Sequence, residues 1–319
     1  MNSVGMSETT STGKFKLTAQ SSFLNMTKKL LLIDFNAIFC RSRSALLKSG
    51  RQYTTADGTP TTGVFSTLNT ILSIIKSQSP THVVICYDAG GNVRKTESDT
   101  YKANRAPVSN DFITEANVLK DEAFYSMGIE TVGIRGVEAD DILYTFSHIA
   151  QFGPGRFDEV VIATVDQDLL QCVTSRCKVL LFNSAKKQEL MGVEEVVEKW
   201  GCGPDDIRYV KAISGDSSDN IIGVKGVGPK TAIKILEESK WLLDAACEHK
   251  KLKEHKELIK SNLDLVVLRN VAGTLGPITW SDHLLGQGIE KDYVGFLEKY
   301  EFSSLLKRAS ATAKLLSLR

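Results

Sequence analysis

The stretch that decides the fold is Val160-Val161-Ile162-Ala163-Thr164-Val165-Asp166-Gln167-Asp168, an apolar, β-branched run that ends in two acids. Two similar runs, Leu30 to Ile33 and Val83 to Tyr87, are followed directly by Asp34 and Asp88. Runs this short and this apolar are typical of buried strands. The sequence therefore predicts three strands, each with an aspartate at its carboxyl end.

A helical pattern separates the first two predicted strands. Its apolar residues recur at spacings of about three and four: Val64, Leu68, Ile71, Leu72 and Ile75. Alternation of strand and helix predicts an α/β fold with a central, mainly parallel sheet flanked by helices. Such sheets bind ligands beyond the carboxyl ends of their strands. The three strand-end aspartates are therefore expected to meet at one edge, although a single one could equally be a turn former or a helix cap.

The composition is that of an ordinary globular protein, with 319 residues, 39 Lys and Arg against 38 Asp and Glu, and 42% hydrophobic residues. No run of about 18 apolar residues occurs, so a membrane protein is not expected. The six cysteines form no Cys-x-x-Cys pair and the five histidines do not cluster around them. This pattern argues against zinc and favours reduced, buried thiols.

Two denser acidic motifs and a third pair add to the strand-end aspartates. Gly136 to Leu143 places three acids in the first turn of a predicted helix, where helix capping alone explains one or two of them. Asp166 and Asp168 are two apart in an extended segment and point the same way, while Asp216 and Asp219 are three apart, the spacing of one face of a helical turn. Nine carboxylates are thus candidate metal ligands: Asp34, Asp88, Glu138, Asp140, Asp141, Asp166, Asp168, Asp216 and Asp219.

Hard oxygen ligands in this number suit Mg²⁺ or Mn²⁺. Without a cation, so many neighbouring carboxylates would repel one another and their pKa values would rise. Two metal ions about 4 Å apart can activate a water molecule and stabilise the leaving oxygen of a phosphodiester. The sequence also lacks a Gly-x-Ser-x-Gly elbow and a dinucleotide-binding glycine loop.

Two segments carry cations suited to phosphate. The first follows Asp88 and contains Arg94, Lys95, Lys102 and Arg105, with Tyr101 as a stacking face for a single strand; by itself it could be a solvated loop. The second, Ile222 to Leu236, is a glycine-rich hairpin that runs into a helix and carries Lys225, Lys230 and Lys234. This hairpin could be only a turn, but its lysines and its helix start favour contact with a duplex backbone.

From about Leu30 to Leu236 the chain resembles the structure-specific 5′-nucleases. This flap endonuclease family includes the 5′-nuclease domain of bacterial DNA polymerase I and the stand-alone bacteriophage 5′-exonucleases. Five segments carry the resemblance: Tyr101 to Pro107, Glu138 to Asp141, Asp166 to Leu169, Gly215 to Asn220, and the hairpin Gly223 to Lys230. One departure is that Ala89 to Arg94 lacks the Phe-Arg pair often found at the start of the family's helical arch.

Residues 1–26 are rich in Ser and Thr and offer little that could form a core, so they are expected to be a disordered tail, which is extra to the family pattern. The resemblance implies that a PIN-like α/β nuclease core follows over 27–200, with a helical arch near 89–112. A helical DNA-binding region over 201–319 would contain a helix-hairpin-helix near 221–237. The lysine-rich stretch over 250–260 carries no motif that can be assigned.

The resemblance also implies roles for individual residues. Asp34, Asp88, Glu138 and Asp140 would hold one metal ion, and Asp141, Asp166, Asp168, Asp216 and Asp219 would bind or support the second. Lys102 and Arg105, with Tyr101, would belong to the arch and act at the scissile phosphate. DNA would be held by Lys211, Lys225, Gly226, Gly228 and Lys230, with K⁺ as a further ion at the hairpin.

The expected function is a metal-dependent 5′→3′ exonuclease and 5′-flap endonuclease that acts on DNA, and on RNA primers paired to DNA, in replication or repair. A cytoplasmic monomer is expected. Two alternatives stay open: a phage-type RNase H of the same superfamily, and a catalytically silent protein that binds DNA junctions.

Overall fold

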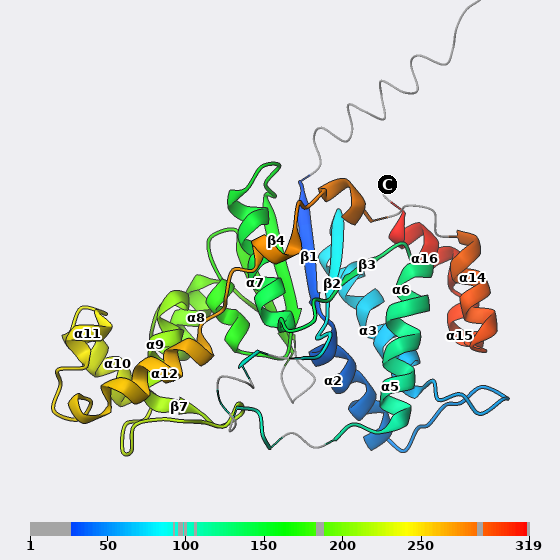
Figure 1. Cartoon of the computed structure of the whole chain (residues 1–319). Helices are drawn as coiled ribbons and strands as arrows, with labels where there is room; N and C mark the ends of the chain where they lie inside the picture. The colour runs from blue at the N-terminus through cyan, green and yellow to red at the C-terminus, as the bar shows by residue number, and fades with distance from the viewer. Residues whose placement is uncertain are drawn as a thin grey trace, which may run out of the picture.

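The computed structural model describes residues 27–91, 93, 94, 98, 101–104, 107–182, 188–285 and 290–317. A six-stranded sheet in the order β3-β2-β1-β4-β5-β6 forms its centre (Figure 1). All neighbouring strands are parallel except the edge strand β6, which is antiparallel to β5. The prediction of a mainly parallel sheet flanked by helices is therefore confirmed. The strands are β1 (Lys29–Asp34), β2 (His82–Cys86), β3 (Glu130–Val132), β4 (Glu159–Thr164), β5 (Cys177–Phe182) and β6 (Gln188–Met191).

The sheet separates two hydrophobic cores because successive side chains of a strand point to opposite faces. Leu30 and Leu32 of β1 belong to one core, with Ile142 and Phe146 of α7 (Ala139–Phe152). Leu31 and Ile33 belong to the other core. Its helices are α2 (Phe35–Lys48), α3 (Thr62–Gln78), α5 (Asn110–Asn117), a π-helical turn (Val118–Ala123) and α6 (Phe124–Ser126).

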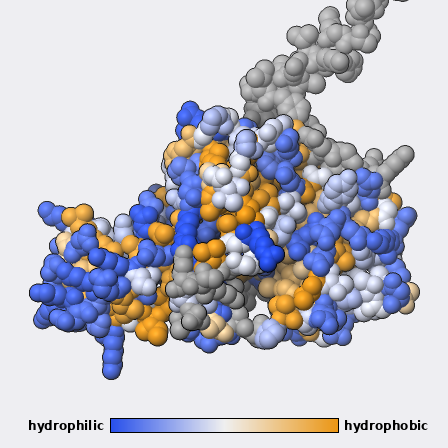
Figure 2. Space-filling model, in the orientation of Figure 1, coloured by the Kyte–Doolittle hydropathy of each residue, from blue (hydrophilic) through white to orange (hydrophobic). Residues whose placement is uncertain are grey.

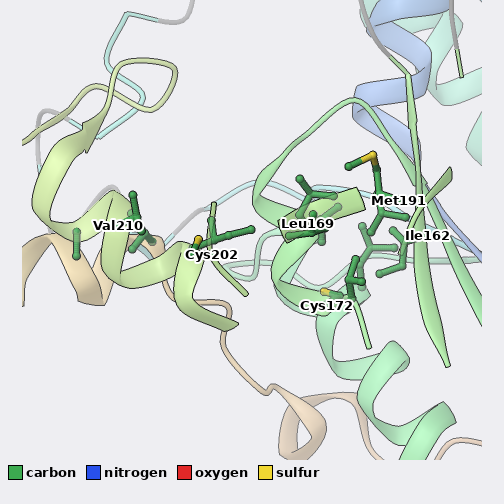
Figure 3. Packing of buried hydrophobic residues seen from close by; sticks show 14 of the residues in the cluster. Ile162, Leu169, Cys172, Met191, Cys202 and Val210 are labelled. Carbon is green, nitrogen blue, oxygen red and sulfur yellow. The ribbon is translucent and has the colours of Figure 1, made fainter. Parts of the chain in front are cut away.

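A helical region extends the first core beyond the sheet. Figure 3 shows this continuity: Ile162, Leu169, Cys172 and Met191 pack near the sheet, and the same core continues to Cys202 and Val210 in the helical region. None of the six cysteines is in a disulfide; five are buried as expected, whereas Cys40 is exposed. The region contains α8 (Val193–Trp200), α9 (Ile207–Ser214), β7 (Gly215–Asp216), β8 (Ile221–Ile222), α10 (Pro229–Glu238), α11 (Leu243–Ala246) and α12 (Lys256–Val266).

The last three helices return to the α/β core. Tyr293 and Leu297 of α14 (Glu290–Lys299) are fully buried in the second core, as is Leu305 of α15 (Ser303–Leu306), and α16 (Ala309–Leu316) packs on α3. Figure 1 places these helices on the side of the sheet opposite the helical region. The expected assignment of all of 201–319 to one DNA-binding region therefore differs from the structure at its carboxyl end, because the apolar residues of α14 and α15 are buried on α6 and its neighbours.

The remaining helical segments are short. They are α13 (Ala272–Leu275) and the 3₁₀ turns Asp168–Cys172, Pro204–Asp206, Lys253–His255 and Trp280–His283. Within the described ranges, no helix is both long enough and apolar enough to cross a membrane. The predicted tail over 1–26 and part of the predicted arch, including Lys95 and Arg105, lie outside the described residues.

Candidate metal centre and nucleic-acid interface

The carboxyl edge of the sheet gathers the strand-end aspartates. Asp34 is the last residue of β1, and Asp88 and Asp166 each follow their strand by two residues. One oxygen of Asp34 accepts a hydrogen bond from the Ala37 amide (3.1 Å) and so caps α2, and the other accepts from Thr164 Oγ1 (2.7 Å). Asp88 accepts from the amide of Ala139 (2.7 Å) at the start of α7. Capping and the gathering of acids therefore occur together in this protein.

These acids repel one another. Burial, together with the charges of Asp166 and Asp88, raises the pKa of Asp34 to about 7. Burial and the charges of Asp166 and Asp34 raise the pKa of Asp140, in the first turn of α7, well above its usual range. A carboxylate pKa raised by like charges shows that several acids share one poorly solvated place. We call Asp34, Asp88, Asp140 and Asp166 the edge acids.

The edge acids fit a hard divalent cation. All four offer oxygen donors, and a divalent ion would relieve the repulsion that contributes to the raised pKa values of Asp34 and Asp140. Among the described residues, however, no three Asp, Glu, His or Cys side chains lie in positions that could hold a metal ion together. Donor chemistry and electrostatics therefore favour a hard divalent cation at the edge acids.

A second set of acids is bound to cationic side chains instead. Lys102 Nζ lies 2.6 Å from Glu138 Oε1 and 3.6 Å from Asp219 Oδ2, and Arg94 also pairs with Glu138. The Tyr101 hydroxyl donates to Glu138 Oε2 (3.1 Å). Burial alone would raise the pKa of Glu138, but Lys102 and Arg94 more than offset it and hold that pKa below its usual value. The charge of Glu138 is thus balanced within the protein.

The backbone brings Lys102 to this place at some conformational cost. Its φ is +52°, a left-handed conformation that is unfavourable for a residue with a Cβ. The Lys102 amide donates to the carbonyl of Asp219 (3.1 Å), and its side chain is only 6% exposed. The predicted arch residue therefore lies folded onto the acids and not in solvent, whereas its predicted companion Arg105 falls outside the described residues.

Lys211 near the end of α9 performs the same task for two further acids. Its Nζ is 2.5 Å from Asp216 Oδ2 and also pairs with Asp168. Burial would raise the pKa of Asp216, but Lys211 and Ser218 keep it lowered. Lys211 was expected to hold DNA; in the structure it is buried between two predicted metal ligands. We call Glu138, Asp168, Asp216 and Asp219 the paired acids.

The loop with Asp216 and Asp219 depends on two glycines. Asp216 lies in β7 and Asp219 in the turn that follows, so the two acids do not share one helical face, and they contact different lysines. Gly215 has a φ of +79°, and a Cβ on it would come within 2.4 Å of the Gly223 nitrogen. Neither glycine can be replaced without moving the chain, so their close approach fixes where Asp216 lies.

The predicted hairpin is exposed in the way that a backbone contact requires. Lys225, Gly226, Gly228 and Lys230 are exposed, whereas the intervening Val224 and Val227 are buried and anchor the loop. Open space lies beside Gly226 and Gly228, directly before α10 begins at Pro229. Figure 2 shows hydrophilic side chains gathered over the outer end of this helical region.

A hollow of about 460 Å³ connects the acids to the hairpin. Asp166 and Gln167 line it from the sheet, Lys211 and Asp216 from the helical region, and Pro229 from the start of α10. The hollow therefore lies between the proposed metal centre and the hairpin.

Sequence reasoning missed two features of the site. Thr164, whose hydroxyl fixes Asp34 and accepts from the amide of Asp166 (2.9 Å), stands inside the strand run and gave no separate signal. Arg94 was grouped with the phosphate-binding cations but is 3% exposed and paired with Glu138 and Asp141. Glu138 and Asp141 are 44 and 47 positions away from Arg94 along the chain, so no local pattern in the sequence indicates these ion pairs.

A comparison with known families accounts for both parts of the molecule. The model of the 5′-3′ exonuclease N-terminal, resolvase-like domain matches residues 29–201, and that of the 5′-3′ exonuclease C-terminal SAM fold matches residues 202–275. The chain belongs to the 5′-3′ exonuclease family. The resemblance found in the motifs is thus confirmed.

Individual relatives agree. The chain is 34% identical to the 5′-3′ exonuclease of Bacillus subtilis, over 66% of this chain and 70% of that protein. It is 30% identical to the DNA polymerase I of Rhizobium leguminosarum, over 88% of this chain and 28% of that protein. The chain spans about a third of the length of the DNA polymerase I relatives that it matches.

Among solved structures, the D15 flap endonuclease of bacteriophage T5, in a complex with DNA and metal ions, has a similar fold. The TM-score is 0.59 at 20% identity, over 91% of this chain and 99% of that one. At this identity the likeness shows the fold alone.

Proposed function

We propose that this protein is a metal-dependent phosphodiesterase that cleaves DNA near 5′ ends, as a 5′→3′ exonuclease and a 5′-flap endonuclease. The observation that carries the proposal is the group of four edge acids at the carboxyl edge of the sheet beside a buried lysine, where burial and the neighbouring carboxylates raise the pKa values of Asp34 and Asp140. The membership of the chain in the 5′-3′ exonuclease family also supports the proposal.

The edge acids would hold the metal, and Glu138, Asp168, Asp216 and Asp219 would join them as ligands or support. Mg²⁺ or Mn²⁺ bound there would polarise the phosphate and lower the pKa of a water molecule. Lys102, and Arg105 as its proposed companion, would stabilise the extra negative charge that develops on the phosphate during cleavage. Tyr101 contributes a hydroxyl that holds Glu138 and thereby supports this arrangement.

DNA would lie across the hollow, with the hairpin gripping the duplex backbone. Exposed amides at Gly226 and Gly228, the start of α10, and the ammonium groups of Lys225 and Lys230 would contact phosphates without reading sequence. K⁺ bound at the hairpin, action on RNA–DNA hybrids, a monomeric state and a cytoplasmic location belong to the same proposal. The T5 neighbour, described as bound to DNA and metal ions, supports the choice of ligands.

One set of substrates tests the proposal. A 5′-labelled flap, a nicked duplex and an RNA–DNA hybrid are each incubated with the protein in Mg²⁺ and in EDTA. Release of the flap and of 5′ nucleotides in Mg²⁺ only is the expected result. Cleavage of the hybrid alone would favour the RNase H alternative, and tight junction binding without any cleavage would favour the silent binding protein.

A further inference from the structure

Asp141 differs from its neighbour Asp140 in what its carboxylate contacts. One oxygen of Asp141 accepts from Arg94 Nη2 (2.8 Å) and from the backbone amide of Arg269 (2.8 Å), and the other accepts from Arg94 Nη1 (2.8 Å). The residue is 4% exposed. Two parallel hydrogen bonds from a guanidinium give a carboxylate its most strongly oriented ion pair.

The chain that supplies the Arg269 amide is the segment that leaves the end of α12, over residues 266–271, which we call the strap. Five of its backbone groups bond to the core. The Val267 carbonyl accepts from Arg94 Nη2 (2.9 Å), and the Val271 amide donates to Thr145 Oγ1 (2.9 Å). Gln171 donates to the carbonyl of Val266 (3.2 Å). The strap is thus fastened to α7 mainly through Arg94, Asp141 and Thr145.

The other end of the connection reaches the hairpin. Asn262 of α12 is buried, and its amide nitrogen donates to the carbonyls of Ile222 (2.9 Å) and Ala212 (3.0 Å). Ile222 lies at the entrance of the glycine hairpin, and Ala212 lies in α9 beside Lys211. One helix and its strap therefore join the hairpin to the start of α7, where Glu138 is the N-cap residue and Asp140 lies in the first turn.

We infer that Asp141 is a positioning residue and not a metal ligand: it fastens the strap and Arg94 to α7, and so aligns Glu138 and Asp140 with the hairpin. Three hydrogen bonds, two of them from a bidentate arginine, already fill most of the acceptor sites of this buried carboxylate, so Asp141 is a poorer donor for a metal ion than its neighbour Asp140. Arg94 also contacts Glu138, so the same guanidinium connects Asp141 to an acid of the site. The effect on cleavage rests on the proposed nuclease function, whereas the assignment of Asp141 does not.

The first experiment compares Asp141→Ala with Asp140→Ala, without DNA. Binding of Mn²⁺ is followed by electron paramagnetic resonance, and amide hydrogen exchange is followed at Arg269 and Val271. For Asp141→Ala we expect Mn²⁺ affinity within about threefold of the parent and exchange in the strap faster by about tenfold or more. For Asp140→Ala we expect Mn²⁺ affinity at least about tenfold weaker and an unchanged strap. The reverse pattern, with weak Mn²⁺ binding and a protected strap in Asp141→Ala, would overturn the inference.

A second pair leaves every acid in place. Arg269→Pro removes the amide that Asp141 accepts from, and Arg269→Ala keeps it. We expect single-turnover cleavage of a 5′ flap to fall about tenfold for the proline variant relative to the alanine variant, with saturating Mg²⁺ leaving the deficit in place. Equal rates for the two variants would overturn the positioning role. If neither the parent nor any variant cleaves the flap, the proposed function is refuted. The exchange and Mn²⁺ results would still decide the role of Asp141.

Discussion

The edge acids and the paired acids lie beside each other, yet their charges are balanced in opposite ways. Asp34 and Asp140 have raised pKa values because of burial and neighbouring carboxylates, whereas Glu138 and Asp216 have lowered ones because lysine and arginine approach them. The difference indicates where an external cation is needed most. It also shows that a list of carboxylates from a sequence mixes two populations that respond differently to substitution.

The largest effect is expected on catalysis. Asp166→Asn should lower single-turnover cleavage by about 10³-fold, because metal-assisted cleavage of a phosphodiester would lose one of the carboxylates proposed to hold the metal. EDTA should have the same effect on the parent. Rates are measured on a 5′-labelled flap, with circular dichroism as a check of folding. Full cleavage by the variant, or by the parent in EDTA, would contradict the metal centre.

Lys102→Ala should reduce single-turnover cleavage by about 10²-fold, the size typical of losing one preorganised electrostatic group. Its ammonium group lies against Glu138 and Asp219, close enough to the site to act on a bound phosphate. Affinity for the flap, measured in Ca²⁺, should change much less. A near-normal cleavage rate in this variant would show that Lys102 only balances Glu138.

Asp34→Asn should stabilise the fold while it inactivates the enzyme. The pKa of Asp34 is about 7 in the folded protein and 3.8 ordinarily, so the folded state binds the extra proton between these values. Stability of the parent therefore rises as pH falls from 8 through 7, and the ionised carboxylate is unfavourable above 7. We expect the free energy of unfolding of the variant to be about 2 kcal/mol higher at pH 8 in EDTA, because the unfavourable buried charge is gone. Asparagine still caps α2, so no capping interaction is lost.

The measurement is urea unfolding of parent and Asp34→Asn at pH 8 and at pH 5, both in EDTA. The gain should shrink at pH 5, where the parent carboxyl is already protonated. A variant that is less stable than the parent at pH 8 would mean that the edge acids do not repel one another.

Lys211→Met should lower the free energy of unfolding, whereas Asp34→Asn should raise it. It leaves Asp168 and Asp216 without their shared cation. We expect a loss of about 1 to 2 kcal/mol, less than for a fully buried pair, because the side chains of Asp168 and Asp216 are 13% and 9% exposed. Mg²⁺ should recover more stability in this variant than in the parent. Lys225→Met, at an exposed position of the hairpin, is the matched control and should unfold like the parent. Equal stability of both methionine variants would refute the distinction between paired and edge acids.

The smallest effect concerns the hairpin. Lys230→Ala should weaken duplex binding by roughly 1 kcal/mol, equally for different DNA sequences, and reduce the slope of log K against log salt by about one unit. Binding is measured by fluorescence anisotropy over a range of salt concentrations. Lys307→Ala, on the far side of the core, serves as the control. A slope that stays the same in the hairpin variant would place the duplex contact elsewhere.

The sequence predicted the strands and the gathering of acids because both are local signals. The runs at Leu30, Val83 and Val160 become β1, β2 and β4 within a residue or so, and parallel pairing then brings their aspartates to one edge. Chemical type and position relative to a strand were enough for that step.

The pairing of acids with cations was not predictable in this way. Arg94 meets Asp141 across 47 positions and Val267 across 173, and no periodicity connects such segments. Lys211 shows why residue type alone misleads: a lysine near DNA-binding motifs suggests a phosphate contact, yet tertiary packing buries this one between carboxylates. Contacts of this kind follow from the whole fold, because the partners come from elements that meet only after the sheet and the helical region have packed together.

The return of α14 to the core also affects how the chain acquires its structure during synthesis. Phe124 and Leu119 belong to the core that α14 covers, and α14 emerges from the ribosome more than a hundred positions later. At roughly 5–20 residues per second, this apolar face stays uncovered for several seconds after the sheet itself is complete. Nascent chains stalled within α12 should therefore bind holdase chaperones through that face, and chains extended past α14 should release them.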